Sequence, residues 1–98
     1  MNTDNFIHLS GTVKGDPLVR EIAKGREVAR FTLAVAGDSE TEYHSVVAWG
    51  RIANKVRQSI NDGSPVSVDG RQVKRSYTSR NGELRQITEV SMSSFTND

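Results

Sequence analysis

Several stretches of the chain alternate apolar and polar residues, which is the pattern of strands that bury one face. In residues 28–35, for example, Ala29, Phe31 and Leu33 alternate with more polar or smaller neighbours. The alternation predicts strands over residues 6–13, 18–22, 28–35, 41–50, 66–77 and 84–92. The stretch at 18–22 is a short extension, and the order that the pattern predicts is strand, bent strand, strand, helix, strand and strand, which counts five strands.

Turn-forming residues separate these strands. Residues 14–17 read Lys-Gly-Asp-Pro, which predicts a turn after the first strand because proline disfavours helix at the residue before it. Lys24-Gly25 predicts a tight hairpin, and Asn81-Gly82 is a strong signal for another. Gly70 predicts a change of register within its strand. Residues 93–98 are polar apart from Phe95, and we expect them to fray.

Only residues 51–61 show the spacing of a helix. Ile52, Ala53, Val56 and Ile60 recur on one side of such a helix, while basic and amide residues occupy the other. Residues 61–65, which read Asn-Asp-Gly-Ser-Pro, predict its end.

One helix between the third and fourth of five strands is the connectivity of the oligonucleotide/oligosaccharide-binding (OB) barrel. We therefore predict an all-β fold, a five-stranded Greek-key OB barrel with one helix between strands 3 and 4. A length of 98 residues suits one domain. We expect this domain to cover residues 1–95, with a short polar end at 96–98. A small β-sandwich with one decorating helix is the alternative architecture.

One face of the strand at residues 41–50 carries two large rings, Tyr43 and Trp49, with smaller residues between them. Six residues of strand separate the rings by roughly 20 Å, so they cannot stack on each other. They could instead hold two parts of an extended ligand, and unpaired bases stack on such rings with ~1–3 kcal/mol each. The opposite face carries His44, Val46 and Ala48. Alternation alone leaves open which face is buried, and a second interpretation places Tyr43 and Trp49 in the core.

The charge is unevenly distributed, although the net charge is only +1. Residues 51–85 hold eight basic and three acidic residues, whereas the rest of the chain is acidic. A basic region that contains aromatic rings suits a polyanion, although a charged stretch is also typical of a solvated face. The candidate nucleic-acid contacts are Tyr43, Trp49, Tyr77, Arg51, Lys74, Arg75, Arg80 and Arg85.

The sequence shows no motif for catalysis or for a cofactor. Cysteine is absent, which excludes disulfides and cysteine-based zinc sites. His8 and His44 lie in predicted strands without a set of further ligands, and no glycine-rich phosphate loop is present. Gly63-Ser64-Pro65 lacks the second glycine of a nucleophile elbow. We therefore expect no catalytic residue, no metal, no cofactor and no enzyme activity.

No segment predicts a membrane location. The sequence has no apolar run near the ~18 residues that a membrane span needs. It also has no charged and then apolar leader at its N-terminus. We therefore expect a cytoplasmic protein without a membrane partner.

Short motifs along almost the whole chain resemble the bacterial-type single-stranded DNA-binding proteins that contain one OB fold. The matching pieces are LSGTV at 9–13, GDPLVR at 15–20, VARFTLAV at 28–35, VVAWGR at 46–51, VDGR at 68–71 and RSY at 75–77. Each piece is short, but their order and spacing together are specific.

The resemblance implies sequence-independent binding and protection of single-stranded DNA in replication, repair or recombination. It implies that Tyr43, Trp49 and Tyr77 stack on bases, and that Arg51 and Arg75 occupy basic positions of the family. It also implies a homo-oligomer, a tetramer or in some relatives fewer chains, located in the cytoplasm with the nucleoid.

The chain departs from the family pattern in two places. The connection at residues 37–41 lacks the additional aromatic that many members carry. No glycine-, glutamine- and proline-rich linker with an acidic tip follows residue 95, so we do not expect recruitment of replication and repair enzymes through such a tip. A barrel without this tip is also similar to primosomal replication proteins. A role as an adaptor in replication restart is therefore an alternative, and RNA binding is a third.

Overall fold

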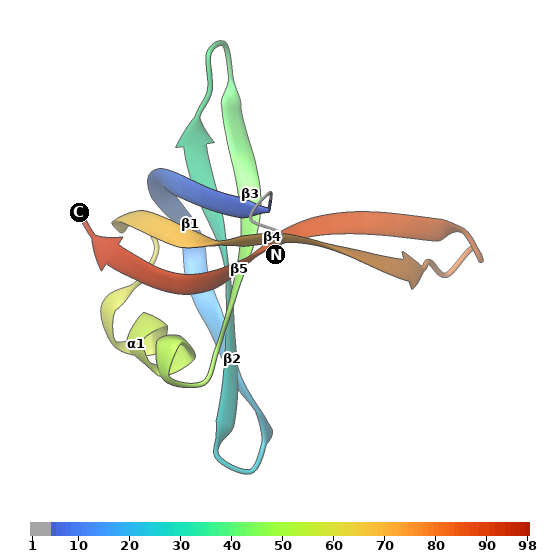
Figure 1. The fold of residues 1–98 in the computed structure, drawn as a ribbon, viewed down its shortest axis with the longest axis horizontal. Coiled ribbons are helices and arrows are strands. Elements are labelled where there is room, and N and C mark those ends of the chain that lie inside the picture. Colours follow the sequence, from blue (N-terminus) through green and yellow to red (C-terminus); the bar gives the residue numbers. More distant parts are fainter. Residues whose placement is uncertain (1–4) are drawn as a thin grey trace.

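The computed structural model describes residues 5–98 as one barrel of strands with a single helix (Figure 1). The elements are β1 (Phe6–Ala23), β2 (Arg26–Ala36), β3 (Thr41–Trp49), α1 (Arg51–Ser59), β4 (Pro65–Thr78) and β5 (Leu84–Asn97). The helix lies between β3 and β4, as predicted. It is too short and polar to cross a membrane, and no other helix occurs in the part of the chain described.

The strands form a closed barrel in the order β1-β2-β3-β5-β4. Strand β1 closes it, because its first half pairs with β4 and its second half with β2, both antiparallel. Strands β3 and β5 are parallel and pair only over Ser45–Val47 and Glu89–Ser91. This topology confirms the OB fold. The alternative of a β-sandwich is wrong, because the ladder closes on itself instead of forming two sheets.

The inward faces of the strands build a small apolar core. In β3 the buried row is Val46 and Ala48, which are opposite Phe31 and Ala29 of β2. The core also contains Val13, Leu33, Val66, Val68, Val90 and Met92, and α1 adds Ala53 and Val56. Successive side chains of a strand point to opposite faces, so Tyr43 and Trp49 point outward. The interpretation that placed them in the core is wrong.

Three hairpins extend from the barrel (Figure 1). Strands β1 and β2 join through Lys24 and Gly25, and β2 and β3 through residues 37–40. Strands β4 and β5 form the longest extension, here called the β4–β5 arm, whose ladder continues to the pair Thr78 and Leu84. The hairpins predicted at Lys24-Gly25 and Asn81-Gly82 are confirmed, as is the register shift next to Gly70.

The turn predicted at residues 14–17 is wrong. Strand β1 runs through this segment, and its pairing with β2 is only interrupted between Lys14 and Leu18. The unpaired segment is held by the loop after α1. Gly15 N donates to Asp62 Oδ1 at 2.7 Å, and Asp62 N donates to Asp16 Oδ1 at 2.9 Å. The turn-forming residues thus form an irregularity within one long strand.

The predicted fraying of residues 93–98 is also wrong. Strand β5 extends to Asn97, which pairs with Val66 of β4. Asn97 Nδ2 donates to Ser59 O at 3.0 Å, and Asp98 N donates to Pro65 O at 2.9 Å. The end of the chain is therefore a strand of the barrel, tied to the end of α1.

Substitution of Gly70 tests the close approach of β4 and β5. A Cβ at Gly70 would lie 2.2 Å from Ser91 O and 2.9 Å from Met92 Cα, both backbone atoms. Overpacking costs about 1–3 kcal/mol. This outweighs the ~0.4–1 kcal/mol that alanine gains over glycine through the unfolded chain. We expect Gly70→Ala to lower the melting temperature by roughly 4–8 °C per kcal/mol lost, measured by thermal denaturation.

The matched control is Gln72→Ala, an exposed position two residues along the same strand. We expect its free energy of unfolding to change by no more than about 0.5 kcal/mol. An unchanged melting temperature for Gly70→Ala would show that the strands can separate at this point.

Candidate nucleic-acid interface

The outer face of β3 carries the two predicted rings. The side chains of Tyr43 and Trp49 are exposed, with 57% and 44% of the residue surface accessible. Because Val46 and Ala48 on the opposite face of β3 are buried in the core, the two rings point away from it. Trp49 is the last residue of β3, opposite Val28 of β2, so its ring lies where the strand leaves the barrel for α1.

Lys14 covers one side of the Tyr43 ring. Its Nζ lies 4.8 Å from the ring centroid, which is the geometry of a cation–π contact. No local pattern in the sequence indicates this contact, because it depends on how β1 and β3 lie on either side of β2. The ammonium places a positive charge directly beside a candidate base platform.

An ion pair crosses the outer face between the two rings. Arg30 of β2 is opposite Val47 of β3, and it pairs with Glu89 of β5 on the far side of that strand. The arginine side chain must therefore pass over β3. This explains why Val47 is only 3% exposed although it lies in the outward row.

Glu89 joins two arginines. Its side chain is 6% exposed, and Arg75 of β4 approaches it from the side opposite Arg30. Arg75 Nε lies 3.3 Å from Glu89 Oε1, and Arg75 Nη2 lies 3.5 Å from Oε2. The two arginine side chains remain partly open to solvent, at 38% and 55%. We call Arg30, Glu89 and Arg75 the central ion cluster.

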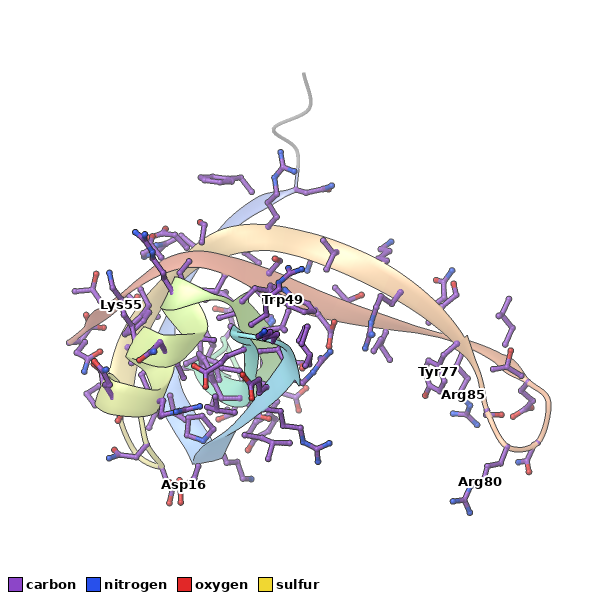
Figure 2. The ribbon with its side chains drawn as sticks, turned by 90° about the horizontal axis from the view of Figure 1, so that it is seen from below. Asp16, Trp49, Lys55, Tyr77, Arg80 and Arg85 are labelled. Carbon is purple, nitrogen blue, oxygen red and sulfur yellow. The ribbon has the colours of Figure 1, made fainter. Side chains whose placement is uncertain are left out.

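The β4–β5 arm continues this outer face. Tyr77 is 46% exposed and lies opposite Arg85, on the same side of the arm as Arg75. Figure 2 shows Tyr77 and Arg85 near the end of the arm, with Arg80 at its tip. Arg85 is partly neutralised, because its Nη2 lies 3.2 Å from Glu83 Oε1.

Two of the predicted basic residues lie elsewhere. Lys74 alternates with Arg75 and therefore faces the other side of the arm, opposite Thr88. Arg51 begins α1 and lines a hollow of about 500 Å³ between the helix and the β1–β2 hairpin, together with Lys55. The structure therefore brings Arg75, Arg85 and the three rings to one face, and leaves Lys74 and Arg51 outside it.

Sequence reasoning missed the part of this face that β1 supplies. A groove of about 270 Å³ is lined by Leu18, Arg20, Val28 and Arg30. Arg20 is opposite Val28, which in turn is opposite Trp49, so the groove adjoins the indole. Leu18, Arg20 and Ile22 share one face of the strand predicted at 18–22, which is a usable signal, but the turn predicted at 14–17 separates this strand from the first.

The described part of the chain holds no arrangement suited to a metal. No group of three or more histidine, aspartate or glutamate side chains converges within residues 5–98. His8 pairs with Asp69, with 2.7 Å between Nδ1 and Oδ1, and His44 lies 3.3 Å from Glu42. These are two separate surface pairs.

Comparison with known proteins identifies the family. The model of the Single-strand binding protein family matches residues 4–97. "Single-stranded DNA-binding protein 1" of Chlorobaculum tepidum is 33% identical over 96 residues, covering 88% of this chain and 59% of that protein. "Single-stranded DNA-binding protein A" of Bacillus subtilis is 36% identical over 93 residues, covering 88% and 54%. The "Single-stranded DNA-binding protein" of Bacteroides thetaiotaomicron is 32% identical over 97 residues, covering 88% and 60%.

The chain thus spans between 54% and 60% of the length of these three relatives. The match to the family model covers nearly every described residue, from the start of β1 to the end of β5. The chain belongs to the single-strand binding protein family.

Proposed function

We propose that this chain binds single-stranded DNA without sequence preference, along the outer face of β2, β3, β5 and the β4–β5 arm. The observation that carries the proposal is the exposure of Tyr43, Trp49 and Tyr77 on one face that also carries arginines. Family membership supports the same ligand, since three relatives are named for binding single-stranded DNA.

Base stacking and phosphate contacts both contribute to binding, through different residues. A ring offers its flat face to any base, so Trp49 and Tyr43 bind without reading base edges. Arginine adds charge for phosphates and can itself stack on bases. Duplex DNA hides the faces of its bases inside the stack, which accounts for a preference for single strands.

The biological role follows from what such binding does. A strand whose bases lie on protein rings cannot pair, and its backbone is shielded along the contact. We propose that the protein protects single-stranded DNA in replication, repair or recombination, in the cytoplasm at the nucleoid. This role requires no bond to be broken, in keeping with a family of binding proteins.

We further propose that the chain forms homo-oligomers, with a tetramer as the expected state and a dimer as the alternative. A large apolar side chain is exposed away from the three rings, that of Phe6, at 68%. Phe6 lies at the start of β1, opposite Arg71 of β4, on a different side of the barrel from Trp49. Its exposure supports a contact between copies there.

Trp49 provides the primary test, because it is the only tryptophan in the chain. We expect its fluorescence to be quenched when a dT oligomer is added. We expect Trp49→Ala to weaken binding of a labelled oligomer by roughly 5- to 150-fold, the equivalent of ~1–3 kcal/mol for one stacked base. Fluorescence anisotropy measures the affinity of both proteins.

The control for Trp49→Ala is Phe6→Ala, which removes an exposed ring on another side of the barrel. We expect its affinity per subunit to match that of the unaltered protein. Absence of quenching together with absence of binding at low salt would contradict the proposed function.

Tyr77 tests whether DNA follows the arm. Because Tyr77 lies near the end of the arm, far from Trp49, a short oligomer on β3 does not reach it (Figure 2). With a dT series spanning about 4 to 16 nucleotides, the known range for one OB fold, we expect Tyr77→Ala to weaken only the longer oligomers. Trp49→Ala should weaken all of them. No loss for Tyr77→Ala at any length would show that the DNA does not extend along the arm.

The oligomeric state is measured by light scattering. The chain has a mass of 10.8 kDa, so a tetramer gives four times and a dimer twice this value. We expect Phe6→Asp to shift the mass toward the monomer, because a carboxylate there opposes burial against a second copy. A mass of one chain for the unaltered protein would contradict self-association.

A further inference from the structure

We propose that Arg30 and Arg75, held together by Glu89, form one binding site for a single phosphodiester group at the middle of the outer face. The inference rests on the proposed binding of single-stranded DNA and adds to it one defined site. Arg30 was not among the residues that the sequence predicted. The site lies between the ring of Trp49 and the base of the β4–β5 arm, where β3 and β5 still pair.

The geometry brings two guanidinium groups to one point. Arg30 Nη1 and Arg75 Nη2 both approach the same oxygen, Glu89 Oε2. These two nitrogens are therefore separated by no more than two hydrogen-bond lengths. Their residues come from β2 and β4, on opposite sides of the β3–β5 pair. No other pair of basic side chains in the described residues shares a carboxylate in this way.

Each guanidinium keeps donors for a ligand. An arginine has five N–H donors, and Glu89 engages one nitrogen of Arg30 and two of Arg75. The carboxylate lies at the bottom, at 6% exposure, while both arginine side chains reach solvent. The side chains that carry the free donors are therefore accessible from the outer face, the side from which a DNA strand would approach.

The net charge of the central ion cluster favours an anion that carries a single negative charge. Two guanidiniums that share one carboxylate oxygen repel each other, and the buried carboxylate cancels one of their charges and leaves the cluster with a net charge of +1. One phosphodiester carries one negative charge and offers oxygens that match the planar fork of arginine. A single phosphate bridging both arginines would neutralise the cluster. Two separate phosphates would give it an excess of negative charge.

The experiment compares the salt dependence of dT binding among arginine variants. Each phosphate neutralised on a single strand contributes about 0.7 to the slope of log affinity against log salt concentration. We expect Arg30→Gln and Arg75→Gln each to lower this slope by about 0.7, because the shared phosphate needs both groups. We expect the double variant to lower it by the same ~0.7 and not by ~1.4.

Lys55→Gln is the control for overall charge. It also removes one positive charge, from an exposed position on α1 (Figure 2), and should leave the slope unchanged. If the double variant does not fold because Glu89 is left unpaired, the triple variant with Glu89→Gln carries the same expectation. Thermal denaturation shows which of the two to use.

The outcomes separate this inference from the proposed function. If dT quenches Trp49 but the single variants keep the full slope, or the double variant loses twice as much as each, the shared site is wrong and DNA binding stands. If the unaltered protein does not bind dT at all, the proposed function itself fails. A common loss in the two single variants and the double variant supports one shared phosphate.

Discussion

The burial of Val46 and Ala48 of β3 in the core determines which side chains of this strand the barrel presents to solvent. Val46 and Ala48 are completely buried opposite Phe31 and Ala29. Full burial of a valine contributes about 1.5–3 kcal/mol. A shift of one residue in register would expose this row and bury Tyr43 and Trp49 in its place. The small core has no room for those rings, so the same interaction that holds β3 in the barrel presents its aromatic residues to solvent.

Much of the fold was predictable, because its signals are local. Alternation located the strands, and Asn81-Gly82 marked the end of the arm. The errors concern pairings between distant segments. The Lys-Gly-Asp-Pro segment at 14–17 reads as a turn by itself, and only its hydrogen bonds with Asp62 show why it stays within one strand. The C-terminal residues read as a frayed end, and only their ladder with β4 makes them part of the barrel.

Some residues of the site are predictable from alternation within one strand, whereas others depend on contacts between distant segments. The outward direction of Tyr43, Trp49 and Tyr77 follows from period two within single strands. Arg30 carries no local signal, since its importance comes from Glu89, which is 59 residues away in the chain. Lys74 and Arg75 are adjacent in sequence and both positively charged, yet the ladder with β5 turns them to opposite sides of the arm. A count of basic residues could not separate them.

The near-neutral net charge of the chain is compatible with a polyanionic ligand, because the placement of single charged groups matters and not only their number. The net charge of +1 describes the field far from the protein, where salt screens it within about 10 Å. A bound strand instead meets single groups at contact distance. On the outer face these are Lys14 beside Tyr43, and Arg30 and Arg75 over a carboxylate that is itself almost inaccessible. Burying the negative partner beneath its cations leaves the positive groups at the surface, so that their placement matters more for binding than their excess over acidic residues.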